Sequence, residues 1–295
     1  MEVKWGAWIS ATRPKTLVAS FIPVMIGASL AFSVHHEINH FLLFLCFSFS
    51  LMVQIGTNLA NDYFDFIRGS DRNRVLAPTR AVASGLLRPN HVRNAAYLFL
   101  GISFAVGIVI YNISNGPHSL FWIGLACISC AVVYTGGPFP LAYNGLGDLF
   151  VILFYGFIAV EATHFVLLVE QKALYTPDFI AALSIGCMTN ILLVVNNYRD
   201  YEEDKKNKKN TLIVIFGRKF GFFLFIFCNL IALLICPFLE PRLWLLYICL
   251  LLSMFGAIKI QKAKTKKEFD QLLSFSAISL LFSGVLSTVG ILLYY

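Results

Sequence analysis

The stretch FLLFLCFSFSLMVQIGTNLANDYFDFIRGSD, residues 41–71, passes from a mostly apolar run into a segment with three aspartates. A run of about 20 apolar residues is long enough to cross the ~30 Å hydrocarbon core of a bilayer as a helix. Carboxylates close to that core are costly unless a positive partner stabilises them. The stretch therefore predicts a membrane-spanning helix that ends near Asp62, Asp65 and Asp71, with a cation bound to these acids.

The composition of the whole chain supports this interpretation. The 295 residues are 58% hydrophobic and 13% charged, with a mean hydropathy of +0.74. Soluble domains carry about 25% charged residues. We therefore predict an all-α polytopic membrane protein, with residues 1–295 forming a single transmembrane domain.

Nine apolar stretches are long enough to span a bilayer. They cover residues 17–33, 41–60, 92–111, 118–134, 146–169, 178–196, 220–238, 242–259 and 272–294. This arrangement puts 21 of the 23 basic residues on one side of the membrane and leaves only Lys172 and Arg242 on the other. The positive-inside rule makes the basic side cytoplasmic, as in a multi-pass protein of the cell membrane. A nucleic-acid partner is not expected, because these residues lie in short membrane loops.

A second acidic segment, NNYRDYEED at 196–204, follows the sixth predicted span. It shares the pattern N-x-Y-x-D with NDYFD at 61–65, at an offset of 135 residues. Each segment ends a span on the cytoplasmic side, and four spans separate the two. We therefore predict two related four-helix halves around a central cavity, with an additional ninth helix.

The spacing within each segment has chemical consequences. Asp62 and Asp65 are three residues apart, and Asp200 and Asp204 are four apart, so on a helix each pair shares one face. Asn58 and Asn197 extend these two faces by one turn, since they precede Asp62 and Asp200 by four and three residues.

Paired carboxylates repel each other, and a hard divalent cation with oxygen ligands relieves the repulsion. Mg²⁺ commonly joins one or two carboxylates to substrate phosphates, which predicts a magnesium–diphosphate site. Nearby cations suited to the remaining phosphate oxygens are Arg68, Arg199, Lys205 and Lys209. The alternative is that the acids only balance nearby arginines in solvated loops.

A diphosphate bound at the membrane surface, next to an aromatic cavity, indicates a lipid-tailed diphosphate. Ionisation of an allylic diphosphate requires a metal for the departing oxyanion and a dry pocket with aromatic faces for the carbocation. The aromatic residues considered for this pocket are Phe47, Phe49, Phe150, Phe154, Tyr155 and Phe157.

Four stretches together resemble the UbiA superfamily of intramembrane aromatic prenyltransferases, and most closely its 1,4-dihydroxy-2-naphthoate branch. They are RPKTLVAS (13–20), NLANDYFDFIRGSD (58–71), YTGGPFPLAYNGLGD (134–148) and NNYRDYEED (196–204). The resemblance implies that both acidic motifs bind Mg²⁺ and the prenyl diphosphate. It assigns this role to Asn58, Asn61, Asp62, Asp65, Asn197, Asp200 and Asp204. Asp71 follows as in the naphthoate branch, and the loop arginine Arg80 is retained.

The segment after Asp204 departs from the family pattern. It reads KKNKKNTL, so that Lys209 and Thr211 match while Lys208 replaces a glycine and Asn210 an arginine. These two changes put the flexibility of the loop and one phosphate contact in question.

The loop at 134–148 contains glycines and prolines that define a tight path between helices. Tyr134 and Tyr143 are candidates for contacts to the aromatic acceptor or the diphosphate, and Asp148 for orienting an acceptor hydroxyl. The alternative is a simple interhelical connection. Glu161 and His164, three residues apart in the fifth span, are either a proton relay or a structural pair.

The expected function is transfer of a polyprenyl chain from its diphosphate to 1,4-dihydroxy-2-naphthoate. Diphosphate and, as the resemblance implies, CO₂ are lost, which gives demethylmenaquinone. Two alternatives remain open: another aromatic acceptor, such as a hydroxybenzoate or homogentisate, and a secondary transporter. The position of the acids distinguishes the enzyme from the transporter, because a carrier places its coupling residues near mid-span. The oligomeric state does not follow from the sequence.

Overall fold

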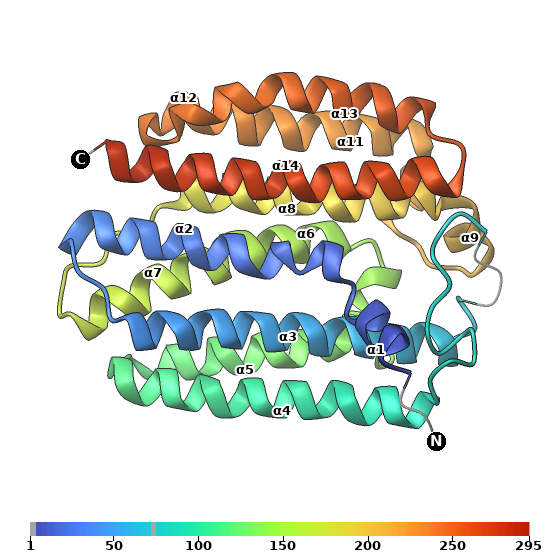
Figure 1. The fold of residues 1–295 in the computed structure, drawn as a ribbon, viewed down its shortest axis with the longest axis horizontal. Coiled ribbons are helices and arrows are strands. Elements are labelled where there is room, and N and C mark those ends of the chain that lie inside the picture. The colour runs from blue at the N-terminus through green and yellow to red at the C-terminus, as the bar shows by residue number, and fades with distance from the viewer. Residues whose placement is uncertain (1–3, 72–74, 295) are drawn as a thin grey trace.

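The computed structural model describes residues 4–71 and 75–294, and its helices run side by side along the long axis of the molecule (Figure 1). Within these residues, eight helical segments are long and apolar enough to cross a membrane, and one apolar helix is shorter. The all-α membrane fold is therefore confirmed, and each of the nine predicted spans corresponds to a helix. The eight segments are α2 (Val18–His35), α3 (His40–Ile67), α4 (Pro89–Ser114), α6 to α7 (Gly147–Glu170), α8 (Phe179–Arg199), α11 to α12 (Arg218–Leu239), η5 with α13 (Pro241–Lys262) and α14 (Lys266–Leu293), and the shorter helix is α5 (His118–Val133).

The second span is longer than predicted. Helix α3 has 28 residues, which at 1.5 Å per residue extend about 42 Å. The apolar span was expected to cover residues 41–60, and the helix continues beyond it through Asn61, Asp62 and Asp65 to Ile67, in agreement with a helix end near the aspartates. A helix of this length exceeds the ~30 Å hydrocarbon core, which allows its polar last two turns to lie outside the core.

We call the end of the bundle that carries Asp62 and Asp200 the acid end, and the opposite end the far end. The short helices α1 (Trp5–Thr12) and α9 (Tyr201–Lys206) lie at the acid end, while the C-terminus lies at the far end (Figure 1). Helix α10 (Leu212–Phe216) follows α9, and the side chain of Thr211 caps its first turn.

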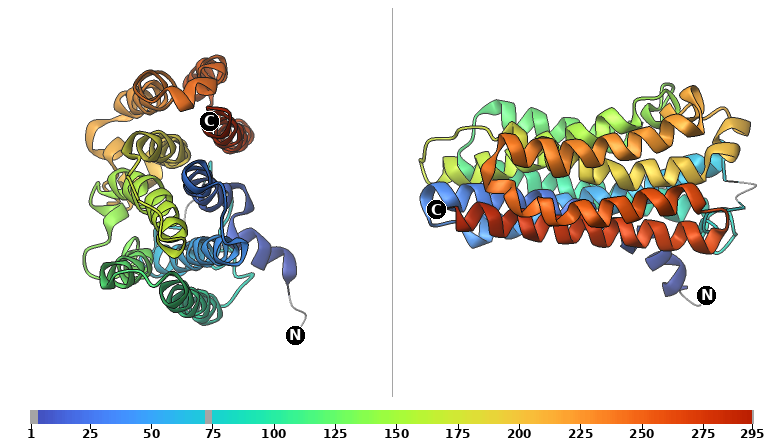
Figure 2. Two further views of the ribbon diagram at one scale, coloured as in Figure 1. Left: turned by 90° about the vertical axis from the view of Figure 1, so that its left-hand side faces the viewer. Right: turned by 90° about the horizontal axis from the view of Figure 1, so that it is seen from above.

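The helices form two groups joined in the middle. In the end-on view of Figure 2, α4 and α5 lie on one side of the molecule and α11 and α13 on the other. Helix α2 packs against α3, α7 and α14, and α8 packs against α11, α14 and the middle of the fifth span. The ninth span, α14, therefore closes the bundle between the two halves.

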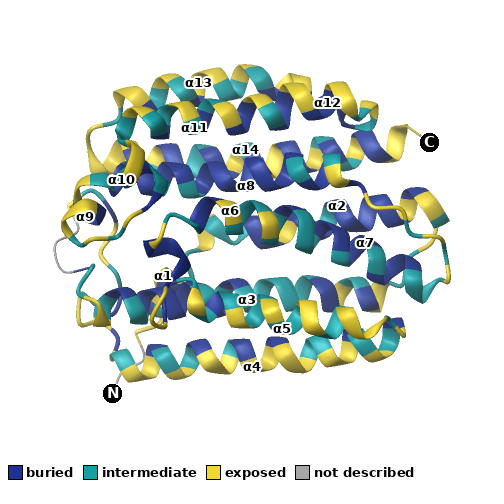
Figure 3. Cartoon of the chain, turned by 180° about the vertical axis from the view of Figure 1, so that it is seen from behind, coloured by how far each residue is buried: buried dark blue, intermediate teal, exposed yellow. Residues whose placement is uncertain are grey.

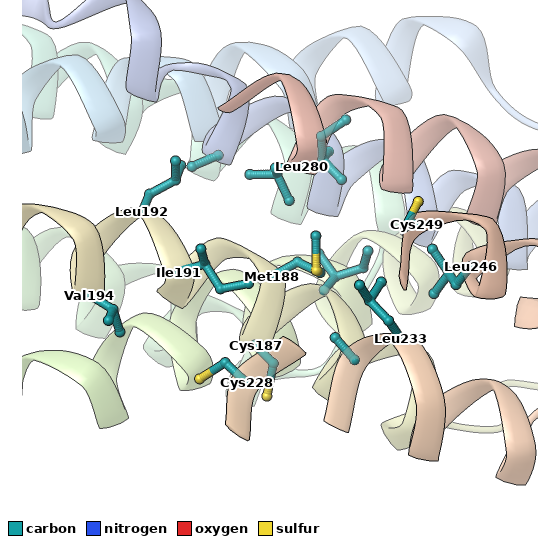
Figure 4. Close-up of a cluster of buried hydrophobic side chains, with 14 of the residues drawn as sticks. Cys187, Met188, Ile191, Leu192, Val194, Cys228, Leu233, Leu246, Cys249 and Leu280 are labelled. Carbon is teal, nitrogen blue, oxygen red and sulfur yellow. The ribbon is translucent and has the colours of Figure 1, made fainter. Parts of the chain in front are cut away.

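Helix α8 lies at the centre of the second half. In its most apolar part, 72% of the residues are buried, compared with 22% in the corresponding part of α4. Figure 3 shows the same contrast between the two helices. The core around α8 includes Met188, Ile191 and Leu233, which lie close together in Figure 4. The cysteines in this core, Cys187, Cys228 and Cys249 among them, are free thiols.

The fifth span is irregular where it crosses α8. It consists of α6 (Gly147–Val151), a π-helical segment η3 (Ile152–Ile158) and α7 (Ala159–Glu170). Two glycines allow the close crossing: a Cβ added at Gly156 would lie 2.5 Å from the Ala182 carbonyl oxygen, and one at Gly186 would lie 2.9 Å from that of Ile152. π-Helical turns are frequent at functional sites, and this one borders the cavity described below.

Candidate active site

The first acidic motif is buried at the end of α3. Asp62, Asp65 and Asp71 are only 1%, 2% and 6% exposed. The chain after α3 folds back over them and brings Arg80 into contact with two of the three acids. The Nη2 atom of Arg80 lies 3.2 Å from Asp65 Oδ2, and its Nε atom lies 3.4 Å from Asp71 Oδ1. Arg80 thus supplies positive charge that the burial of these acids requires.

The second motif lies where α8 ends and α9 begins. Asp200 is the last residue before α9, and Arg199 binds it with two hydrogen bonds, Nε to Oδ1 at 2.6 Å and Nη2 to Oδ2 at 2.9 Å. Asp204 lies one turn later, since its amide donates to the Asp200 carbonyl at 2.8 Å. Lys209 Nζ is 3.8 Å from Asp204 Oδ1. Both aspartates are 7% exposed, so this motif is as buried as the first.

Tyr143 connects the first motif to the loop between α5 and α6. Its hydroxyl donates to Asp65 Oδ1 at 2.8 Å and lies 2.7 Å from Ser70 Oγ. Two cations lie over its ring: Arg68 at 5.2 Å and Lys209 at 5.4 Å from the ring centroid. Because Lys209 also contacts Asp204, Tyr143 bridges the two acidic motifs.

Backbone contacts hold the same loops together. Arg68 donates to the carbonyl oxygens of Thr135 at 3.2 Å and Gly137 at 2.5 Å. The Asn207 side chain donates to the Ser70 carbonyl at 2.9 Å. The Asn210 amide donates to the Tyr143 carbonyl at 3.1 Å. The loop at 134–148 is therefore more than a connection, because it contacts the segments that follow both motifs.

A cavity of about 290 Å³ extends from the acid end into the first half of the bundle. Helices α3 and α5 contribute the largest parts of its wall, α7 and the π-helical segment contribute further residues, and α8 contributes Thr189, Leu192, Leu193 and Asn196. Its aromatic lining consists of Phe49, Phe150, Phe154, Tyr134 and Tyr155. Phe47 and Phe157, which the sequence also suggested, pack elsewhere, against Phe21 and Phe179.

Most of the predicted site residues gather at the acid end. Asn58, Asn61 and Tyr134 line the cavity, and Asn61 Oδ1 accepts a hydrogen bond from Thr135 Oγ1 at 2.7 Å. Asn197 is buried beside the second motif but does not line the cavity.

The structure places Asp148 at the contact between α6 and α8. It is absent from the cavity wall, and its Oδ1 atom accepts from Asn190 Nδ2 at 3.1 Å, which joins α6 to α8. This contact links two spans, and the orientation of an acceptor hydroxyl by Asp148 stays a prediction. Two predicted phosphate ligands are also engaged: Arg68 with backbone carbonyls and Arg199 with its neighbour Asp200.

Among the polar residues of the cavity that sequence reasoning missed are Arg13, Gln54 and Asn196. Arg13 opens the motif RPKTLVAS, which was a signal for it. Gln54 stands in the middle of an apolar span, where a polar side chain is costly without a partner. Its partners are Tyr155, whose hydroxyl donates to Gln54 Oε1, and Asn58, whose Oδ1 accepts from Gln54 Nε2 at 3.5 Å.

The donor chemistry of the acid end fits Mg²⁺. All five predicted ligands (Asp62, Asp65, Asp71, Asp200 and Asp204) carry hard oxygen donors, and all are buried. In the described part of the chain, no three acidic, histidine or cysteine side chains converge on one point. Mg²⁺ usually takes one or two carboxylates and completes its shell with water and substrate phosphates. The acids therefore suit a metal that arrives with a diphosphate, rather than a cage made only of protein ligands.

Glu161 and His164 lie away from this site, outside the cavity wall. Glu161 Oε2 accepts from the Tyr175 hydroxyl at 2.7 Å, and its Oε1 accepts from the Asp178 amide at 3.0 Å. His164 Nδ1 is 3.8 Å from Glu161 Oε2. These contacts tie α7 to the segment before α8, and they favour the structural pair over the proton relay.

Comparisons with known proteins agree with this architecture. The chain is 36% identical over 213 residues to a 1,4-dihydroxy-2-naphthoate octaprenyltransferase of Mycobacterium leprae, covering 72% of this chain and 70% of that protein. It is 25% identical over 294 residues to UbiA prenyltransferase domain-containing protein 1 of Danio rerio, and the match covers 99% of this chain and 86% of that protein. The structure of a UbiA homologue from Archaeoglobus fulgidus bound to DMAPP and Mg²⁺ superposes on this chain with a TM-score of 0.61 at 16% identity. The superposition covers 96% of this chain and 98% of that one. The model of the UbiA prenyltransferase family matches residues 20–291, so the chain belongs to the UbiA prenyltransferase family.

Proposed function

We propose that this protein transfers a polyprenyl chain from polyprenyl diphosphate to 1,4-dihydroxy-2-naphthoate, with loss of diphosphate and CO₂, giving demethylmenaquinone in its reduced, quinol form. One observation carries the proposal: buried carboxylates at the ends of α3 and α8 follow directly on Asn58, Asn61 and Asn196, which line a largely apolar cavity with aromatic residues in its wall. This pairing suits a substrate with a diphosphate head and a hydrocarbon tail. The names of the naphthoate-specific relatives support the choice of acceptor.

In this proposal the acid end holds the diphosphate. Asp62, Asp65, Asp71, Asp200 and Asp204 would bind Mg²⁺, which when bound stabilises negative charge on the leaving diphosphate. Arg80 and Lys209 lie beside these acids and supply donors for the remaining phosphate oxygens. Asn58 and Asn61, on the cavity wall, supply neutral hydrogen-bond donors where the diphosphate head of the substrate meets its prenyl tail.

The cavity provides the setting for the transfer. The bond between the first prenyl carbon and the diphosphate oxygen breaks, and its electron pair leaves with the diphosphate. The faces of Phe150, Phe154 and Tyr155 stabilise the allylic cation without attacking it, and the apolar wall excludes water that would trap it. The electron-rich ring carbon that carries the carboxylate then forms the new C–C bond. The C–CO₂ bond at that carbon breaks, its electron pair returns to the ring, and loss of CO₂ restores aromaticity.

We also propose that the acid end faces the cytoplasm, in the cell membrane. The support is the distribution of charge, with 21 of 23 basic residues on that side of the predicted spans. The positions of the acids at helix ends also favour an enzyme over a transporter, which would need ionisable groups near the bilayer midplane.

Mass spectrometry of reaction products tests this proposal. Purified protein in lipid nanodiscs with Mg²⁺ is offered 1,4-dihydroxy-2-naphthoate, 4-hydroxybenzoate or homogentisate, each with a ladder of prenyl diphosphates. The Asp65→Asn variant serves as the inactive control. We expect a prenylated, decarboxylated product from the naphthoate. Product from 4-hydroxybenzoate or homogentisate alone would contradict the acceptor, and no product from any pair would contradict the activity.

A further inference from the structure

Helix α1 exposes two large apolar side chains at the acid end. Trp5 is 71% exposed and Ile9 is 59% exposed. They are four residues apart, so they lie on the same face of the helix, and we call this pair the apolar stripe. Large apolar side chains are more stable in an apolar environment than in water. The exposure of the stripe therefore indicates an apolar partner.

The other two faces of α1 have different surroundings. Ala7 and Ala11 are buried against the end of α3 and the loop that follows it. Gly6 and Ser10 form a third face, which is exposed and carries no large apolar side chain. At about 100° per residue, the three pairs point in three different directions. A helix that lies on a bilayer beside its own protein needs such a division, because it meets protein, lipid and water on separate sides.

The position of α1 in the molecule fits a bilayer surface. In the end-on view of Figure 2, α1 extends outward from the bundle, away from the ends of the other helices. Residues 13–17 are the whole connection between α1 and the membrane-spanning helix α2, so α1 lies close to the level at which that span begins. The space beside the bundle at this level belongs to the lipid headgroups. The exposed lysines Lys4 and Lys15 flank α1 and suit anionic headgroups.

The length of α1 also calls for a stabilising partner. The helix has eight residues, and isolated helices of this length are not stable in water. Its buried face offers only the methyl groups of Ala7 and Ala11 and part of Trp8 to the protein. Insertion of the apolar stripe into lipid would supply the additional apolar burial.

A hydrogen bond connects the end of α1 to the cavity. Asn58 Nδ2 donates to the carbonyl oxygen of Thr12, the last residue of α1, at 2.8 Å. Asn58 is buried and lines the cavity. A contact that orders α1 therefore also holds a peptide bonded to the cavity wall.

We propose that α1 is an interfacial anchor, which inserts Trp5 and Ile9 into the boundary between the headgroups and the acyl chains of the bilayer. Its partner is the lipid surface next to the acid end. The inference goes beyond the proposed function and does not depend on the identity of the acceptor, because it concerns only where this helix binds.

Tryptophan fluorescence of the full chain in nanodiscs tests the depth of the stripe. The substitutions Trp8→Phe, Trp122→Phe and Trp244→Phe leave Trp5 as the single fluorophore. One quencher is phosphatidylglycerol and phosphatidylcholine brominated in the upper part of the acyl chains, and the other is acrylamide in water. The matched control combines Trp5→Phe with Ser10→Trp, which moves the fluorophore to the exposed face without the stripe.

We expect brominated lipid to quench Trp5 strongly and acrylamide to quench it weakly, with a depth of about 5–10 Å into the boundary. The Ser10→Trp control should show the opposite order. Trp5 that is quenched by acrylamide and untouched by brominated lipid would place α1 in water. Trp5 that is protected from both quenchers would indicate a protein partner. Either result contradicts the anchor.

Amide hydrogen exchange tests the same proposal with all four tryptophan positions intact except Trp5. The variant combines Trp5→Ser with Ile9→Ser, and serine has nearly the helix propensity of tryptophan and isoleucine, so the change reports the loss of apolar burial. In nanodiscs, we expect exchange of the α1 amides to accelerate about tenfold or more, while Ser10→Ala leaves it unchanged. Exchange in the double variant within about twofold of the wild type would overturn the anchor.

Discussion

Replacing Tyr143 with phenylalanine removes the hydroxyl group that joins the loop at 134–148 to Asp65 of the first acidic motif. That hydroxyl donates to Asp65 Oδ1 at 2.8 Å. Burial, followed by the negative charge of Asp65, raises the pKa of Tyr143 well above its ordinary value. The phenol therefore remains protonated and keeps donating over the whole working pH range, and its loss leaves the Asp65 carboxylate with one hydrogen bond fewer.

The size of the effect follows from the charge on Asp65. A hydrogen bond to a charged group contributes about 1.5–3 kcal/mol, and ~1.4 kcal/mol corresponds to a factor of ten. The substitution leaves Arg80 in place, with its Nη2 atom 3.2 Å from Asp65 Oδ2, so the carboxylate keeps a charged partner. We therefore expect Tyr143→Phe to lower kcat/KM for prenyl diphosphate by about 10- to 30-fold, the lower part of this range.

The assay measures initial rates in nanodiscs at saturating acceptor while prenyl diphosphate is varied. Ser70→Ala is the control, because Ser70 Oγ contacts the Tyr143 hydroxyl at 2.7 Å and no bond from its side chain to Asp65 is present. Its effect should be smaller, at most about tenfold, as for a neutral hydrogen bond. A folded Tyr143→Phe protein within about twofold of the wild type would refute the positioning of Asp65 by Tyr143, since even a neutral hydrogen bond contributes ~0.5 kcal/mol.

Three further results are expected. Excess EDTA should abolish turnover and added Mg²⁺ should restore it; full activity in chelator would exclude the metal site. Gly156→Leu should lower Tm by at least ~3 °C, because its Cβ would lie 2.5 Å from a backbone oxygen of α8. Gly101→Leu is the control and should leave Tm unchanged, because a Cβ at Gly101 meets nothing within 4 Å. Equal Tm values for the two variants would contradict the close crossing of the fifth span and α8. In a cysteine-free background, Ser70→Cys should not react with a membrane-impermeant thiol reagent added outside the cell. Leu174→Cys, which lies on the connection at the far end and is 81% exposed, should react with it. The reverse pattern would contradict an acid end that faces the cytoplasm.

The sequence was sufficient for the membrane fold because its signals are local. Each span is an apolar run whose length the bilayer dictates, and the acidic motifs stand out against that background. The apolar part of the second span ends near residue 60, but helix α3 continues through Asp62 and Asp65 to Ile67, because polar residues continue a helix at little cost outside the hydrocarbon core. Partners such as Arg80 then stabilise them.

The contacts that complete the site are not local, and single residues show why they escaped prediction. Asp148 was expected to orient an acceptor hydroxyl because it belongs to the loop at 134–148. Its hydrogen-bond partner Asn190 comes from α8, 42 residues away in the chain. The Tyr143 hydroxyl reaches Asp65 across 78 residues of chain. Arg13 enters the cavity because the chain turns at a left-handed residue, and no periodic pattern in the sequence encodes that turn.

The central claim is that the two acidic motifs form one diphosphate site, and a double-mutant cycle of Asp65→Asn and Asp200→Asn tests it most directly. Loss of one transition-state contact commonly costs a factor of about 100 or more in rate, so each single variant should fall by that amount in kcat/KM. Residues that act as a unit are strongly non-additive, and the folded double variant should therefore be scarcely slower than either single one. Single variants close to the wild type, or losses that multiply fully in the double variant, would contradict a shared site.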